Sequence, residues 1–144
     1  MSQISIHDAD KYYNRRKGNQ IHVINRIGLE LPESGMVAVF GRSGCGKTTL
    51  LNAIGGLDTL DSGSILVDGQ DMRQNTDYLR NRYIGYIFQN YNLVPILNIY
   101  ENIVLPVELD GDTVDKRFLN EIVHLLGLED KLKKMPNNLS GGQQ

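Results

Sequence analysis

The chain has 144 residues, of which 40% are hydrophobic and 22% charged, and its formal net charge is −2. This length suits one globular domain, and the small charge excludes a general attraction to nucleic acid or to an anionic membrane. No window approaches the roughly eighteen apolar residues that span a bilayer. The N-terminus does not resemble a signal peptide, and the single cysteine cannot form an internal disulfide. We therefore expect a cytoplasmic protein.

Apolar patterns predict strands along the first part of the chain. The alternation that begins at Ile4 predicts a strand reaching Tyr13, and a second alternation predicts a strand over residues 23–32, after a solvated basic turn at residues 15–17. The continuous apolar run over residues 36–40 is typical of a strand buried on both faces. A helix is expected over residues 49–54, ended by two glycines. Residues 65–67 predict a strand, and the Asp68-Gly69 pair that follows predicts a hairpin turn.

Helical patterns dominate the second half. After a strand candidate at residues 83–88, we expect a helix over residues 97–107 that ends near Pro106. Residues 113–126 suit an amphipathic helix with Val114, Phe118, Ile122 and Leu125 on one face. A short helix is expected over residues 128–135. This mixture of strands and helices predicts an α/β or α+β fold around a phosphate-binding strand–loop–helix unit.

One segment matches the phosphate-loop pattern G-x-x-x-x-G-K-[ST]. It consists of Gly41, Arg42, Ser43, Gly44, Cys45, Gly46, Lys47 and Thr48, with Thr49 following. Its glycines let backbone N–H groups converge on phosphate oxygens at the start of a helix. Lys47 is expected to reach the β- and γ-phosphates, and the Thr48 hydroxyl to bind Mg²⁺. The segment, with Thr49, therefore predicts a site for a nucleoside triphosphate, namely ATP.

Cys45 lies inside this loop, at a predicted helix N-terminus and beside Lys47. A helix N-terminus and a neighbouring cation both favour the thiolate form of cysteine. We expect a reactive thiol that bound nucleotide protects. The alternative, a small loop residue without a role, stays open.

Many folds carry a phosphate loop, and a second motif indicates which of them this chain has. The last residues include Leu139, Ser140, Gly141, Gly142 and Gln143. Alone, Ser140 with Gln143 describes a helix capping box. After a phosphate loop, the segment resembles the signature of ATP-binding cassette (ABC) ATPases, and the chain resembles them from about Ile4 to its end.

The resemblance implies the ABC type of P-loop NTPase fold. It comprises an antiparallel β subdomain, part of the core sheet and the start of the helical subdomain. Residues 1–144 would then be the N-terminal portion of a single nucleotide-binding domain. In the family, the serine and glycines of the signature face the γ-phosphate bound by a partner subunit, so two domains enclose ATP head to tail.

Two further residues match the family in order and spacing. Gln89 precedes Asn90-Tyr91-Asn92-Leu93, which resembles the glutamine loop; its amide oxygen would bind Mg²⁺ or orient water, but is too weak a base to deprotonate it. Lys11-Tyr12-Tyr13 resembles the segment whose aromatic ring stacks on adenine, and the family spacing favours Tyr13. Tyrosine is also common in strands for structural reasons alone.

Residues 85–89 and 100–106 look most like one branch of the family. That branch contains macrolide-exporter, lipoprotein-releasing and antimicrobial-peptide-resistance ATPases. Its members act with a separate membrane permease, at the inner face of the cell membrane. Leu93, Val94, Ile96 and Leu97 would line the docking groove for the permease or belong to the core, and both interpretations stay open.

Hydrolysis in the family uses residues downstream of the signature: a strand ending in aspartate, a catalytic glutamate after it, and a switch histidine. None of them is among these 144 residues, because Asp68 is expected in a turn and the three histidines precede the signature. We therefore expect exposed apolar surface, an exposed sheet edge, marginal stability and weak or absent ATP turnover. The resemblance thus implies the ATP-hydrolysing subunit of a membrane transporter. One alternative to this function is a regulatory module that dimerises with ATP. Another is a cassette ATPase acting on DNA or ribosomes, but the lack of basic surface counts against it.

Overall fold

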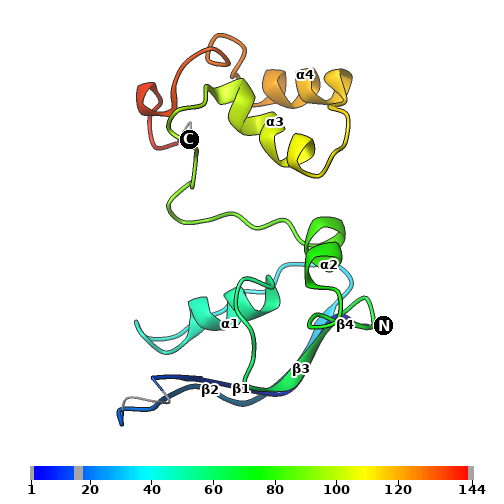
Figure 1. The fold of residues 1–144 in the computed structure, drawn as a ribbon, viewed down its shortest axis with the longest axis vertical. Coiled ribbons are helices and arrows are strands. Elements are labelled where there is room, and N and C mark those ends of the chain that lie inside the picture. Colours follow the sequence, from blue (N-terminus) through cyan, green and yellow to red (C-terminus); the bar gives the residue numbers. More distant parts are fainter. Residues whose placement is uncertain (1, 15–17, 143–144) are drawn as a thin grey trace. The chain divides into compact units, whose positions relative to one another are not determined.

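The computed structural model describes residues 2–14 and 18–142, and the chain divides into two compact units, Met1–Tyr86 and Ile87–Gln144 (Figure 1). The predicted basic turn at residues 15–17 and Gln143 of the signature lie outside the described residues. Among the helices that are described, none has both the length and the apolar character needed to cross a bilayer.

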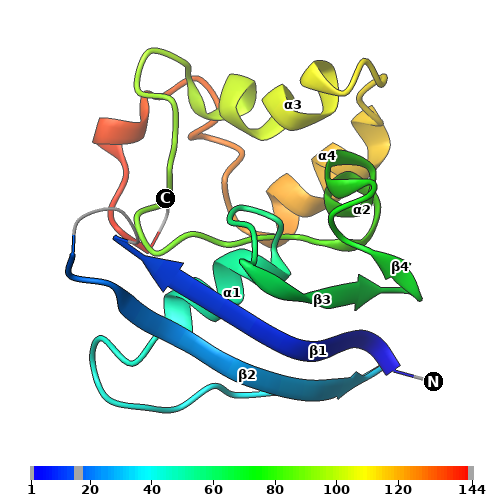
Figure 2. The ribbon, with the colours of Figure 1, turned by 60° about the horizontal axis from the view of Figure 1, so that its bottom comes forward.

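A four-stranded antiparallel sheet in the order β2-β1-β3-β4 forms one side of the first unit (Figure 2). Its strands are β1 (Ser2–Tyr13), β2 (Ile21–Pro32), β3 (Ser62–Val67) and β4 (Gln70–Asp71). The strands expected from residues 4, 23 and 65 onward are thus confirmed. Asp68 and Gly69 have φ values of 48° and 74°, as a two-residue hairpin turn requires. Asp68 is therefore a turn residue, as the sequence predicted.

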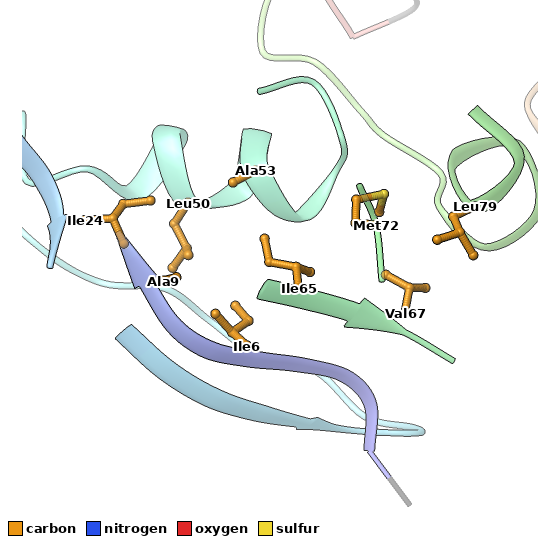
Figure 3. Close-up of a cluster of buried hydrophobic side chains, with 9 residues drawn as sticks. All are labelled: Ile6, Ala9, Ile24, Leu50, Ala53, Ile65, Val67, Met72 and Leu79. Carbon is orange, nitrogen blue, oxygen red and sulfur yellow. The ribbon is translucent and has the colours of Figure 1, made fainter. Parts of the chain in front are cut away.

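The core of the first unit lies between this sheet and two helices, α1 (Lys47–Ile54) and α2 (Thr76–Tyr83). The predicted helix behind the phosphate loop is confirmed as α1, which ends at Gly55. Helix α2 was not predicted, because it buries a single side chain, Leu79, and has no apolar face to reveal it. Figure 3 shows the buried cluster, which consists of Ile6, Ala9, Ile24, Leu50, Ala53, Ile65, Val67, Met72 and Leu79.

A bulge in β1 changes which side chains face this core. The pairing of β1 with β2 shifts register between Ile6 and Ala9, and Asp8 between them has a φ of 43°. One extra residue reverses the alternation of a strand. Ala9 and Lys11 therefore become buried like Ile6, with exposed fractions of 0%, 8% and 1%.

Two predicted strands are wrong. Residues 36–40 form no strand, and Met36 and Phe40 are 96% and 90% exposed. Tyr83 ends α2 instead of starting a strand, and Ile87 is 97% exposed. An apolar run forms a strand only where a neighbouring strand takes up its N–H and C=O groups. Within residues 2–14 and 18–142, no segment pairs with either run.

Helices α3 (Ile99–Leu109) and α4 (Lys116–Leu125) and a 3-10 turn at Pro136–Asn138 make up the second unit. A reciprocal capping box begins α3: Asn98 Oδ1 accepts from the Glu101 amide at 2.9 Å, and Glu101 Oε2 accepts from the Asn98 amide at 2.7 Å. This cap sets the start two residues later than predicted. Pro106 lies within the helix and does not end it. Proline removes one backbone bond, but its carbonyl still accepts from the Asp110 amide at 3.2 Å, so the next turn forms.

The buried face of α4 differs from the predicted one. Leu119 and Val123 pack on Val104 of α3, whereas Phe118 and Leu125 are 62% and 78% exposed. Leu119 lies one position further along than Phe118, so the actual core stripe is rotated by about 100° from the predicted one. The helix expected over residues 128–135 is also wrong. Its backbone bonds join residues three apart, Lys131 to Leu128 and Lys134 to Lys131, which makes successive turns.

Asp10 provides a test of how the β1–β2 pairing depends on pH. Its carboxylate lies 2.7 Å from His22 Nε2, and accepts from the Arg26 amide at 3.2 Å and the Ser62 hydroxyl at 3.1 Å. The hydrogen bond with His22 contributes most to holding the pKa of Asp10 below its ordinary value of 3.8. A lowered folded-state pKa stabilises the fold above pH 3.8, and this contribution is lost as pH falls through the folded pKa.

Replacing Asp10 with asparagine is therefore expected to lower the free energy of unfolding at neutral pH. The difference from the unmodified chain should shrink as pH falls below 3.8, and urea unfolding from pH 7 to about pH 3 measures it. A difference that stayed constant down to the lowest pH would contradict a stabilising role for the ionised Asp10.

Candidate functional site

The predicted phosphate loop leads directly into α1. Cys45 N donates to Arg42 O at 3.3 Å, which turns the loop back, and Leu50 N donates to Gly46 O at 2.9 Å as the first bond of the helix. No side chain caps α1, and its first turn carries no acidic residue. The first amides of a helix have no acceptor within it. They therefore form, with the helix dipole, a local site for an anion.

Gly46 holds this loop against β2. Its φ is 94°, and a Cβ at this position would lie 2.9 Å from both the carbonyl oxygen and Cγ1 of Val23. Positive φ and close backbone approach both favour glycine over any other residue. The glycine before Lys47 thus fixes the position of the loop on the sheet.

The ammonium group of Lys47 lies within the turn of the loop. Its Nζ donates to the carbonyl oxygens of Gly41 at 3.0 Å and Arg42 at 2.9 Å. Arg42, Ser43 and Gly44 are exposed around it. The loop therefore presents a cation together with backbone amides, which is the arrangement that binds phosphate groups.

Thr48 is exposed at the start of α1, next to Lys47. No group of three or more acidic, histidine or cysteine side chains able to hold a metal occurs within the described residues. Mg²⁺ in nucleotide sites takes one or two protein oxygens, and its other ligands are waters and substrate phosphates. A lone hydroxyl at the end of a phosphate loop fits that donor set, so Thr48 is the residue here that would hold the ion.

Tyr13 lies beside the same helix. Its hydroxyl donates to Asp58 Oδ2 at 2.7 Å, and this bond raises the pKa of Tyr13 although the nearby Thr49 side chain opposes the change. The ring lies 5.3 Å from Lys11 Nζ, and the residue is 39% exposed. The structure thus brings the predicted base-stacking residue to the first turn of α1, within the unit that holds the phosphate loop.

Two residues of this site, Lys11 and Asp58, were not predicted from the sequence. The Lys11 ammonium forms an ion pair with Asp58 Oδ1 and donates to Thr59 O at 2.6 Å. Burial raises the pKa of the Asp58 carboxyl, but hydrogen bonds from Lys11, Tyr13 and the Thr59 amide outweigh burial and hold that pKa below its ordinary value. The alternation of the strand did not predict that Lys11 is buried, because the bulge at Asp8 moves Lys11 to the core face of β1.

The segments predicted to form the glutamine loop and the signature belong to the second unit. Gln89 is exposed in a turn, and Ser140 and Gly142 are exposed as well. A Cβ on Gly141 would lie 3.1 Å from the hydroxyl oxygen of Tyr91. The two segments therefore lie next to each other, and the 3-10 turn directly precedes Leu139.

The segment after Gln89 is fixed by Asn102 of α3. The Asn102 side chain accepts from the Val94 amide at 2.7 Å and donates to the carbonyls of Val94 at 3.1 Å and Leu97 at 2.9 Å. Of the apolar residues expected to line a groove or the core, Ile96 is 81% exposed. Leu93 lines an open cavity of about 490 Å³ that also contacts Leu139 of the signature.

Cys45 is exposed, and its sulfur lies 3.9 Å from Lys47 Nζ and against Gly41, where a Cβ would approach it to 2.6 Å. Phosphate in the loop would cover this sulfur. We expect saturating Mg-ATP to slow alkylation of Cys45 by iodoacetamide, measured by mass spectrometry over time. The chain has one cysteine, so the unfolded chain supplies the unprotected rate. Equal rates with and without nucleotide would remove the prediction.

Comparison with known proteins agrees with this geometry. The family model described as ABC transporter matches residues 24–144. The chain belongs to the ABC transporter family. The match includes the residues predicted to form the phosphate loop, the glutamine loop and the signature.

Several ABC transporter proteins are similar over most of the chain. The macrolide export ATP-binding/permease protein MacB of Mannheimia succiniciproducens is 39% identical and covers 100% of this chain and 23% of its own length. The putative ABC transporter ATP-binding protein MG065 homolog of Mycoplasma pneumoniae is 44% identical, over 85% of this chain and 27% of its own length. The methionine import ATP-binding protein MetN of Pasteurella multocida is 39% identical, over 88% of this chain and 38% of its own length.

Solved ABC structures share the fold. The dimeric bacterial ABC transporter cassette MJ0796 has a TM-score of 0.84 and 29% identity, covering 97% of this chain and 64% of that one. The same cassette in a post-hydrolysis state bound to ADP and phosphate has a TM-score of 0.83. The chain thus spans about a quarter of its first curated relatives and under two thirds of the solved cassette. The predicted ABC-type P-loop fold is confirmed.

Proposed function

We propose that this chain binds Mg-ATP as the N-terminal portion, residues 1–144, of a single ABC nucleotide-binding domain. The observation that carries this proposal is the phosphate loop, in which Lys47 Nζ lies 3.0 and 2.9 Å from the carbonyls of Gly41 and Arg42 at an uncapped helix start. Phosphate oxygens are stronger acceptors for a lysine than neutral carbonyls. The ammonium would therefore exchange these carbonyls for the β- and γ-phosphates.

Each remaining site residue has a proposed part in phosphoryl transfer to water. Mg²⁺, when bound, neutralises charge on the phosphates, and the Thr48 hydroxyl would hold it. Gln89 would bind the ion or orient the attacking water. Tyr13 would stack on adenine. Ser140, Gly141 and Gly142 would donate to the γ-phosphate bound by the partner domain. The proposed chemistry therefore needs a head-to-tail dimer.

The proposed role of the whole protein is to couple ATP binding and hydrolysis to transport by a membrane permease. The names of its relatives, which include export and import proteins, support a transport system, and the macrolide-export name of MacB supports an exporter for a drug. Export of a peptide or a lipoprotein is proposed from the resemblance of residues 85–89 and 100–106 alone. The chain would then work in the cytoplasm, at the inner face of the cell membrane. The dimeric state of the similar cassette MJ0796 supports a second nucleotide-binding domain as partner.

The proposal is tested by titrating the purified chain with Mg-ATP in a calorimeter while phosphate release is assayed in the same sample. We expect binding with little turnover, because these 144 residues contain no glutamate in the family's catalytic position. Rapid turnover would show that a catalytic carboxylate lies within them. A folded chain that bound no ATP would overturn the proposal.

A further inference from the structure

Lys11 is a buried charge in the core face of a strand. It is 8% exposed, and it is the one charged or polar residue classed as buried among residues 2–14 and 18–142. Burying an ammonium group is unfavourable unless it is paired and hydrogen-bonded. A lysine at this buried position therefore needs partners for its charge, and the structure provides them.

Asp58 satisfies this charge and at the same time holds Tyr13. One carboxylate oxygen, Oδ1, pairs with Lys11 and accepts from the Thr59 amide at 2.8 Å. The other, Oδ2, accepts from the Tyr13 hydroxyl at 2.7 Å. The second bond of Lys11, to Thr59 O at 2.6 Å, fixes the ammonium from another side. Both carboxylate oxygens of Asp58 thus have partners, and these contacts set the orientation of the carboxylate.

The Tyr13 ring is consequently restrained at two places. Its hydroxyl donates to Asp58, which follows α1, and lies near the Thr49 side chain in the first turn of α1. Its face lies 5.3 Å from the Lys11 ammonium, within the range of a cation–π contact. Thr49 directly follows Thr48, so these contacts connect the ring to the phosphate loop.

We propose that Lys11 and Asp58 are positioning residues that hold the Tyr13 ring at a set place relative to the phosphate loop, ready to stack on a nucleobase. This inference rests on the proposed role of Tyr13 in stacking on adenine. A ring already fixed before binding loses less conformational freedom when a base stacks on it. The Lys11–Asp58 pair then strengthens binding of a nucleotide without strengthening binding of its phosphates alone.

The test compares the affinities of the chain for Mg-ATP and for inorganic tripolyphosphate, which lacks a base, by calorimetry. Asp58→Asn is expected to weaken ATP binding about 3- to 10-fold and to leave tripolyphosphate binding unchanged, since base stacking alone accounts for about 5- to 150-fold in affinity. Asp77→Asn is a matched control that removes the same charge from a side chain that is 90% exposed, and it should change neither affinity.

Tyr13→Phe covers the case in which Asp58→Asn fails to fold, because this variant keeps both the ring and the buried ion pair. It removes only the hydroxyl that donates to Asp58. We expect weaker ATP binding, by about 3- to 10-fold, with tripolyphosphate binding again unchanged.

The outcomes separate this inference from the proposed function. If Tyr13→Ala weakens ATP binding but Tyr13→Phe and Asp58→Asn do not, the ring stacks without being positioned, and the inference is wrong while the function stands. If Tyr13→Ala has no effect on ATP binding, the stacking role itself fails. If Asp58→Asn weakens ATP and tripolyphosphate equally, the pair supports the fold of the loop, and the positioning role is overturned.

Discussion

Replacing Lys47 with alanine is expected to weaken Mg-ATP binding about 10- to 100-fold. Its ammonium is the cation that lies within the loop, held by the carbonyls of Gly41 and Arg42. A hydrogen bond to a charged group contributes about 1.5–3 kcal/mol, and every 1.4 kcal/mol or so is about a tenfold change in affinity. Calorimetric titration of both proteins under the same conditions measures the change.

The fold should survive this change, because the Lys47 side chain is not part of the buried cluster. Lys133→Ala is a matched control, since Lys133 is an exposed lysine of the second unit and its loss removes the same charge. It should leave ATP affinity within about twofold, as surface charge acts weakly across solvent. Equal affinity of the Lys47→Ala variant and the unmodified chain would mean that the lysine does not reach the phosphates.

Replacing Gly46 with alanine is expected to have the largest effect on the loop itself. The added Cβ would lie 2.9 Å from the carbonyl oxygen of Val23, a backbone atom of β2 rather than the end of a flexible side chain, and the φ of 94° is unfavourable for alanine. The conformation alone costs about 1–3 kcal/mol. We expect a loss of about 3 kcal/mol or more in the free energy of unfolding, measured by urea unfolding.

Gly111→Ala separates the two causes of that loss. Gly111 has a φ of 80° and no atom within 4 Å of an added Cβ, so alanine there meets conformational strain without a clash. It should cost about 1–2 kcal/mol. A Gly46→Ala variant no less stable than Gly111→Ala would mean that the loop does not pack on Val23. ATP binding should be lost in Gly46→Ala and kept in Gly111→Ala.

The elements that were predicted correctly are those whose evidence is local. The Asp68-Gly69 turn follows from the positive φ values that short turns need, and the alternation before it follows from a half-buried antiparallel strand. The turn at Arg42–Cys45 that leads into α1 likewise depends on a few neighbouring residues. Spacing along the chain is sufficient for such features.

The failed predictions concern features that depend on distant partners. Residues 36–40 have the composition of a buried strand, yet Met36 is 96% exposed because pairing requires another strand beside it. Helix α4 carries apolar residues on two adjacent stripes, and contact with Val104 of α3 decides that Leu119 and Val123 are buried while Phe118 is not.

The sequence by itself determined the family, because the motifs that indicate it are short runs of consecutive residues. Only the tertiary structure decided that Lys11 and Asp58 surround Tyr13. Lys11 and Asp58 are 47 residues apart in the chain, and the bulge at Asp8 turns the lysine inward. A contact over such a separation arises from the packing of β1 against the segment after α1, which local patterns do not encode.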